Sequence, residues 1–445
     1  MDRLGTFTLL VAAGILTGVL FVPPVIGLAN NGDYGKVSLH YSLFSPNEEE
    51  FYFAPQIHQF LPDKQWDSGF FTSTHLPVQA ALFLHRLSGQ KDFDCRFLGA
   101  VYCALFLLAL GIFQPCLTQL TTLRRAFFSA ILLLLLCDIV YIALFNTFFM
   151  DATALTGFLL AAAAWLRYER SQKLGWLLLF TAASLLAMLS KAQHLLPALP
   201  LVLLVASKPR PARLLSAVLL LAGFVYGFRQ IQEDYNPITI FNVTFHAILP
   251  LSNNQPQHLA ELGFDESYTK WIGTHAYDLG SRVGEPEFYR ELLRRSSQAK
   301  IAYFLATHPT IAFNILLQRL AEAAFVRPLN FGNYDRSAGR PPLARSNAFS
   351  LASSAKSWLF LGHPFFLLAY AFILGAIALR RPASLALVAL VATTFLAFAI
   401  GAFGDSLDVT RHLTLFNLLL DLLLLTALYT GLNYHRLKAV GLSCD

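Results

Sequence analysis

The chain has 445 residues, of which 56% are hydrophobic and only 13% are charged, and its mean hydropathy is +0.53. A soluble globular chain carries about 25% charged residues, so the composition excludes an ordinary soluble domain and predicts an all-α polytopic membrane protein. The net charge of +6 is modest and no basic helix with interleaved aromatic residues accompanies it, so we expect membrane lipids and no nucleic acid as partners.

Apolar blocks that could cross a bilayer recur along the chain, and we count about ten. They lie at about 6–28, 97–117, 126–147, 152–166, 174–190, 195–206, 214–228, 357–379, 385–403 and 411–432. The first block is interpreted as a retained span that continues to about Leu28. The pattern predicts an N-terminal transmembrane module over residues 1–228 and C-terminal transmembrane helices over residues 357–445.

Basic residues gather in the short loops between these blocks. The clusters are Arg124-Arg125, Arg167 to Lys173, Lys208 to Arg213, Arg380-Arg381 and His435 to Lys438. With the N-terminus inside and ten spans, every cluster falls on the cytoplasmic side of the membrane. The segments expected on the far side are 29–96, 148–151, 191–194, 229–356 and 404–410.

The two long far-side segments, 29–96 and 229–356, are expected to contain helices. Residues 70–87 mix apolar and polar positions and predict an amphipathic helix on the membrane surface. Helical spacing also runs through 287–305 and 310–326, with a break at His308-Pro309. Residues 328–347 are rich in Gly, Pro, Asn and Arg and predict a loop.

A glycine-flanked turn holds the first candidate carboxylate. The stretch Asn30-Asn31-Gly32-Asp33-Tyr34-Gly35-Lys36 follows the first apolar block, so we expect Asp33 where a membrane helix ends and an aqueous loop begins. Glycine tolerates the backbone angles of a tight turn beside the carboxylate. Asp33 could therefore act as a general base or bind a cation. The plainer alternative is a helix-ending turn with a solvated Asp.

Two further carboxylates are candidates for catalysis. Asp151 lies in the very short second far-side turn, either as an ordinary turn residue or lining one site with Asp33. Two carboxylates there could deprotonate an acceptor hydroxyl or hold Mg²⁺ or Mn²⁺ against a phosphate leaving group. Asp138 lies inside an apolar run, on one helical face with Tyr141 and Phe149. A buried carboxylate there is a functional candidate, unless a neighbouring hydroxyl satisfies it.

Several polar residues are candidates for binding an anionic substrate. Lys191, Gln193 and His194 end the fifth block and could grip a phosphate, although a lysine there could also reach the interface. Arg411 and His412 begin the last block, against the positive-inside trend, which suggests an anionic partner. The alternative for Arg411 is an ion pair with Asp408 at helical spacing. His75, on the predicted surface helix, is a further candidate for substrate contact. Its spacing from the other histidines carries no metal-site signal.

Four short motifs complete the pattern: Asp138…Tyr141…Phe145-Asn146-Thr147-Phe148-Phe149, Ser190-Lys191-Ala192-Gln193-His194, Asn333-Tyr334-Asp335-Arg336-Ser337 and Arg411-His412-Leu413…Phe416-Asn417…Asp421. Together with the Asp-bearing external loops, they resemble the GT-C superfamily of integral-membrane glycosyltransferases. Within it they look similar to bacterial glycan-biosynthesis hexose transferases. The resemblance covers nearly the whole chain.

The resemblance implies a site on the periplasmic face of a bacterial inner membrane. The donor would be a polyprenyl-phosphate-linked sugar and the acceptor a lipid-linked or cell-surface glycan. The acidic residue of the first loop, the usual catalytic base of the superfamily, corresponds to Asp33. Many members carry a second acidic residue beside it, where this chain has Tyr34, so the use of a divalent cation stays open.

Two alternatives belong to other classes. A lipid-linked glycan ligase or polymerase would share the topology and could activate its acceptor with a histidine instead of Asp33. A transporter or flippase should show an internal repeat and midplane polar residues in several spans. We find no such repeat, and Asp138 stands nearly alone within the apolar blocks.

Overall fold

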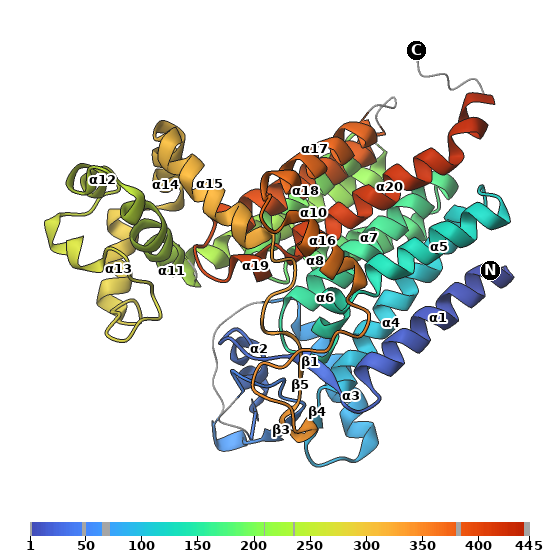
Figure 1. The fold of residues 1–445 in the computed structure, drawn as a ribbon, viewed down its shortest axis with the longest axis horizontal. Coiled ribbons are helices and arrows are strands. Elements are labelled where there is room, and N and C mark those ends of the chain that lie inside the picture. The colour runs from blue at the N-terminus through green and yellow to red at the C-terminus, as the bar shows by residue number, and fades with distance from the viewer. Residues whose placement is uncertain are drawn as a thin grey trace.

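The computed structural model describes residues 2–46, 50–64, 72–208, 210–234, 236–379 and 384–439. It is 71% helical. Long helices form a bundle, and a lobe of shorter helices projects from one end of it (Figure 1). The start of α1 and the end of α20 both lie at the other end of the bundle, apart from each other (Figure 1).

Five helices in the described part of the chain are long and apolar enough to cross a membrane. They are α1 (Arg3–Leu20), α4 (Arg96–Phe113), α10 (Pro211–Asp234), α18 (Leu385–Phe403) and α20 (Thr414–Ala439). Two bent pairs raise the number to seven if each pair is one span. These are α5 (Thr122–Leu136) with α6 (Ile139–Ile142), bent by 47°, and α16 (Leu351–Phe360) with α17 (Phe365–Leu379), bent by 115°. The count of about ten spans stays a prediction.

The remaining bundle helices are α7 (Asp151–Ser171), α8 (Leu174–Met188) and α9 (Leu199–Ala206). The central helix α7 is buried on most of its surface and packs on both α8 and α4. A Cβ at Gly157 would lie 2.9 Å from the Cβ of Ala187, so glycine allows α7 and α8 to approach closely. This packing fixes the first residue of α7, Asp151, at the lobe end of the bundle.

The first helix ends earlier than the sequence predicts. We expect the span to continue to Leu28, but α1 ends at Leu20 and residues 26–28 form a strand. The reason is Pro23-Pro24, because proline cannot continue a helix and disfavours helical backbone in the residue before it. Asp33 therefore follows a strand instead of a helix.

Two small sheets form within the segments 26–94 and 331–334, so the all-α prediction is wrong in this detail. β1 (Ile26–Leu28) pairs antiparallel with β5 (Phe331–Tyr334). β2 (Leu43–Phe44), β3 (Ile57–Phe60) and β4 (Phe93–Asp94) form the second sheet, in the order β2-β3-β4. β5 lies inside the segment 328–347, which the sequence predicts as loop. The β1–β5 pair holds the segment that follows α1 against the segment that follows α15.

The predicted amphipathic helix at 70–87 is α3 (His75–Ser88), and residues 70 and 71 lie outside the described residues. α3 packs on α4 through Val78, Ala81 and Leu82 and leaves Phe83 exposed. The helical spacing of the apolar residues in α3 is the reason that the sequence predicts this helix.

The lobe consists of α11 (Asn236–Phe241), α12 (Gln255–Glu261), α13 (Pro286–Arg295), α14 (Gln298–Thr307) and α15 (Pro309–Ala323). Phe241, Phe245 and Leu292 belong to its own apolar core. The predicted break before α15 is confirmed. The expected helix over 287–305 divides in two, because the Ser297 side chain accepts a hydrogen bond from the Lys300 amide and caps a new helix.

Candidate active site

Four segments that are distant in the sequence meet at the lobe end of the bundle. They are the turn after β1, the first residue of α7, the turn after α8, and α19 (Val409–His412). Together they bring Asp33, Asp151, Lys191 and Arg411 into one group of ion pairs. The sequence selected each of the four separately, and the structure places them in contact.

Asp33 is held by three cations. Its Oδ2 lies 2.6 Å from Arg411 Nη2 and 3.3 Å from Lys191 Nζ, and its Oδ1 lies 2.7 Å from Lys36 Nζ. The turn that carries it is fixed by Asn30, whose Oδ1 accepts hydrogen bonds from the amides of residues 32 and 34. Gly32 has a φ of +98°, which favours glycine. The predicted turn is thus present, and its carboxylate is ion-paired instead of solvated.

Asp151 faces the same two cations from the start of α7. Its Oδ2 lies 3.4 Å from Arg411 Nη1 and 3.7 Å from Lys191 Nζ. Its Oδ1 accepts a hydrogen bond of 3.2 Å from Gln193 Nε2 and lies 3.8 Å from His194 Nε2. The His194 ring is oriented on its other side by Ser190 Oγ, 2.9 Å from Nδ1. Lys191, Gln193 and His194 therefore all lie at the site, as the sequence predicts.

Arg411 connects three carboxylates. Besides Asp33 and Asp151, its Nε donates a hydrogen bond of 2.6 Å to Asp408 Oδ2. The guanidinium lies over the ring of Phe149, 5.1 Å from its centroid, a favourable cation–π position. Asp408 also accepts a hydrogen bond from Asn31. Arg411 therefore makes the local ion pair with Asp408 and also contacts Asp33 and Asp151, which are distant in the sequence.

The charges in this site balance, because Asp33, Asp151 and Asp408 face Lys36, Lys191 and Arg411. Burial by itself would raise the pKa of Asp33, but the charges of Arg411, Lys191 and Lys36 outweigh it and hold that pKa well below its usual range. Asp33 is therefore ionised at neutral pH.

This donor set does not fit a divalent cation. Each of the three carboxylates is already paired with an ammonium or a guanidinium group. Within the residues that the structure describes, no three His, Cys, Asp or Glu side chains are grouped as metal ligands. Arg411 and Lys191 are instead groups that suit an anion such as a phosphate.

Three predicted residues take no part in these ion pairs. His412 follows Arg411 on α19, and its ring lies close enough to Lys191 and Asp33 to interact with their charges. His75 begins α3, where its Nδ1 lies 3.0 Å from the hydroxyl of Tyr41. Asp138 caps α6, and its carboxylate accepts hydrogen bonds from the amides of Val140, at 3.0 Å, and Ser353, at 2.8 Å.

The prediction that Asp138 shares one helical face with Tyr141 and Phe149 is wrong. The chain bends at Asp138, between α5 and α6, so these residues do not continue one helix. Its buried carboxylate is satisfied by two backbone amides, which is the structural role of a helix cap. The hydroxyl of Ser353 also interacts with this carboxylate, so the neighbouring hydroxyl of the sequence-based alternative is present beside the amides.

The sequence reading missed Lys36 and gave Asp408 no role beyond the ion pair with Arg411. Lys36 stands three residues after Asp33, the spacing of neighbours on one helical face, and that spacing was the available signal. It also missed a second polar group within the bundle. Asp421, on α20, lies 2.6 Å from Lys356 Nζ and accepts a hydrogen bond of 2.7 Å from the Tyr141 hydroxyl. Asp138 is thus not nearly alone.

Comparison with known proteins gives one family match. The model described as YfdI N-terminal transmembrane domain matches residues 2–440. No curated protein matches the chain, and no solved structure matches it. The match and the apolar helices together identify a membrane protein with several transmembrane helices.

Proposed function

The chain belongs to the family of YfdI N-terminal transmembrane domains, and we propose that it is a glycosyltransferase that uses a polyprenyl-phosphate sugar as donor. The acceptor is a hydroxyl of a lipid-linked or cell-surface glycan. In this proposal about ten spans place the ion-paired site on the periplasmic face of a bacterial inner membrane. The observation that carries the proposal is the convergence of Arg411 and Lys191 on Asp33 and Asp151.

The two cations supply the binding site for the donor phosphate. Both side chains are buried, with 4% and 5% of their surface exposed. A buried cation needs a counter-ion, and here Asp33 and Asp151 fill that role. A lipid phosphate at the membrane surface would compete with the carboxylates, and its contacts to the guanidinium and the ammonium would be charge-assisted hydrogen bonds.

The reaction then needs one nucleophile, one leaving group and one base. The acceptor hydroxyl oxygen attacks the anomeric carbon of the sugar, and the bond from that carbon to the phosphate oxygen breaks. Polyprenyl phosphate leaves with the bonding electrons, stabilised by Arg411 and Lys191. Asp33 takes the hydroxyl proton.

Donor binding also explains how Asp33 becomes a competent base. A carboxylate whose pKa lies well below its usual range is a weak base. As the phosphate takes over Arg411 and Lys191, Asp33 loses the charges that lower its pKa. The base would therefore be activated when the donor is bound and stay paired when the site is empty.

A direct test is sugar transfer by the purified full chain from a panel of synthetic polyprenyl-phosphate hexoses to a lipid-linked glycan. Transfer from at least one donor that is lost in Asp33→Asn supports the proposal. Failure of every donor to bind or react, with correctly folded protein, contradicts it. A ligase or polymerase would instead transfer a preassembled glycan and would depend on a histidine, for which His194 is the candidate.

A second candidate function is transport of a lipid-linked glycan. The observation that favours it is the Lys356–Asp421 ion pair within the bundle, because ionisable groups inside membranes often mark substrate pathways. The pair also has a structural reading, since it joins α16 to α20. Vesicles that hold the chain would distinguish the two, because a transporter moves a labelled lipid across the membrane without making a glycosidic bond.

A further inference from the structure

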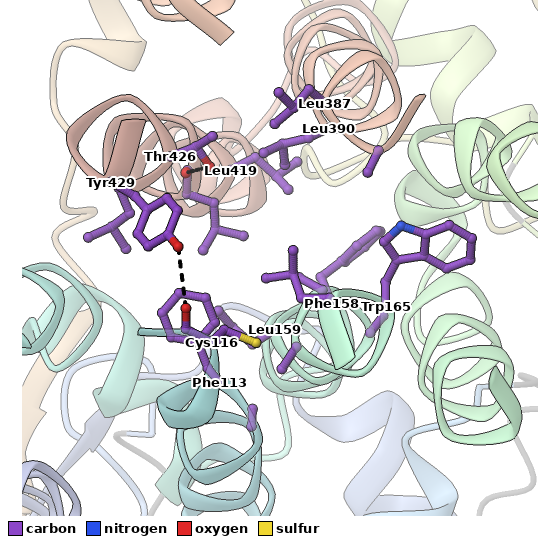
Figure 2. A pocket seen from close by; sticks show the side chains of 18 of the residues that line it. Phe113, Cys116, Phe158, Leu159, Trp165, Leu387, Leu390, Leu419, Thr426 and Tyr429 are labelled. Atoms are coloured by element: carbon purple, nitrogen blue, oxygen red, sulfur yellow. Dashed lines mark hydrogen bonds between the residues drawn. The ribbon is translucent and has the colours of Figure 1, made fainter. Parts of the chain in front are cut away.

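A cavity of about 240 Å³ lies in the part of the bundle away from the ion-paired site. It is enclosed mainly by α4, α5, α7, α9, α18 and α20, and its lining is almost entirely apolar (Figure 2). Phe158 and Leu159 of α7 lie opposite Leu390 of α18 and Leu419 of α20 (Figure 2). None of the residues of the ion-paired site lines it.

The cavity has the length of a lipid chain in one leaflet. Its lining on α7 begins at Phe158 and ends at Arg170, which is ~18 Å at about 1.5 Å per residue. Half of a hydrocarbon core about 30 Å thick is ~15 Å. The charged site is at the other end of α7, at Asp151, so the cavity belongs to the opposite leaflet.

A cation stands at the end of this cavity. Arg170 is exposed, and it donates long hydrogen bonds to two neutral oxygens, Pro115 O at 3.5 Å and the Tyr429 hydroxyl at 3.4 Å. No carboxylate of the described chain pairs with it. Arg167, one turn earlier, lies over the Trp176 ring, so this end of the bundle presents guanidinium groups to an anionic headgroup.

Two buried polar atoms in the lining lack partners. Within the described residues, Trp165 Nε1 and Thr393 Oγ1 have no hydrogen-bond partner. Leaving a buried donor without an acceptor is unfavourable, and an apolar cavity that holds only hydrocarbon would not relieve this cost. Trp165 lies five residues from Arg170, ~8 Å along the helix. If the phosphate of a lipid lies at Arg170, the ester oxygens that follow the phosphate would lie near Trp165.

From these observations we propose that the cavity binds one anionic glycerophospholipid. The headgroup phosphate lies at Arg170, an ester oxygen accepts from Trp165 or Thr393, and one acyl chain fills the apolar cavity. The ligand differs from the sugar donor in leaflet and in position, so the inference stands independently of the proposed glycosyl transfer.

Native mass spectrometry of the delipidated full chain tests the proposal, with phosphatidylglycerol and phosphatidylcholine of the same acyl chains as probes. One phosphatidylglycerol should bind per chain, with phosphatidylcholine roughly tenfold weaker, because the choline cation offsets the charge of the phosphate that both lipids present to Arg170. Arg170→Gln should remove this preference. Lys173→Gln removes a neighbouring exposed charge that does not line the cavity and should keep it.

A second pair of variants tests the chain-binding part. Ala389→Phe fills the cavity from α18, whereas Val388→Phe places the same side chain at the adjacent exposed position, which does not line it. Only Ala389→Phe should abolish the bound lipid, with thermal unfolding recorded for both. The proposal would be overturned if phosphatidylglycerol and phosphatidylcholine bind equally, or if Ala389→Phe and Val388→Phe lose the bound lipid equally. Displacement of phosphatidylglycerol by polyprenyl phosphate would also overturn it. If Ala389→Phe does not fold, the exposed Arg170→Gln and Lys173→Gln pair decides the question.

Discussion

Arg411 Nη2 lies 2.6 Å from Asp33 Oδ2 and so joins the start of the last apolar segment to the turn that follows β1. The same guanidinium reaches Asp151 through its other terminal nitrogen, at 3.4 Å. Arg411 is thus the one described residue that pairs with carboxylates from three separate segments, the third being Asp408. The site depends on it both for charge balance and for the arrangement of the loops.

Arg411→Ala is expected to destabilise the protein. The substitution leaves three partly buried carboxylates without their shared partner, and breaking a buried ion pair typically costs about 3–5 kcal/mol. Thermal unfolding in detergent measures the effect. The double variant Arg411→Ala/Asp33→Asn should recover part of the loss, because it also removes one uncompensated charge. Identical unfolding of the single and double variants would show that the two charges are not coupled.

Asp33→Asn tests the catalytic role of the carboxylate. The amide keeps the shape of the side chain and removes the base, so the rate of sugar transfer should fall about 10²–10⁴-fold. Donor binding should be kept or strengthened, since the phosphate no longer competes with a carboxylate for Arg411. Asp63→Asn, an exposed position in the same external segment, serves as control. A chelator should have no effect on the wild type, because the carboxylates are paired with cations of the protein.

The site residues could be predicted from the sequence because they are charged residues next to apolar blocks. Asp33, Lys191 and Arg411 stand at the ends of apolar blocks, where their charges need a reason, and a one-sided topology puts them on one face. Which atoms pair could not be predicted, because the contacts join segments that only the packing of α7 and α8 and the β1–β5 pair bring together.

The misses have physical causes as well. Asp138 was assigned to catalysis because the bend after Cys137 has no proline or glycine to announce it. The end of α1 could have been predicted, since Pro23-Pro24 stops a helix. The position of Asp421 inside the last apolar block was an available signal. Its contact with Lys356 could not be predicted, because it depends on the bend between α16 and α17.

His58 is expected to make stability depend on pH. It lies buried in the external segment, with its ring stacked on Tyr34 at 5.4 Å, and burial lowers its pKa to about 3. An unfolded histidine has a pKa of about 6.5. Between these values the unfolded chain binds a proton that the folded chain does not, so stability is complete above about pH 6.5 and decreases as the pH falls toward 3. The expected loss between pH 6.5 and 5 is about 2 kcal/mol.

The measurement for His58 is the free energy of unfolding at several pH values. His58→Phe should reduce the slope between pH 6.5 and 5, because its own proton-binding difference disappears. His194, whose pKa burial also lowers to about 3, should keep contributing a slope in the variant. His363→Phe changes an exposed histidine and should keep the wild-type slope. Asp33 does not contribute between pH 6.5 and 5, because a carboxyl group with a lowered pKa loses its contribution only at more acidic pH. A slope in His58→Phe equal to that of the wild type would contradict the role given to His58.

Lys191 and Lys36 offer the sharpest separation of phosphate binding from support of Asp33. Both ammonium groups contact Asp33, but only Lys191 also faces Asp151, and its side chain is 5% exposed against 24% for Lys36. A buried cation between two carboxylates is the better phosphate ligand, because fewer water molecules screen it. Lys191→Gln should weaken binding of a polyprenyl-phosphate donor by about tenfold or more, the loss of one charge-assisted contact. Lys36→Gln should change donor affinity less and act mainly through the pKa of Asp33, shifting the pH dependence of turnover upward.

Isothermal titration with the donor and pH–rate profiles separate the two effects. Equal losses of affinity in both variants would mean that the two lysines are general counter-charges and that Lys191 has no particular role at the phosphate.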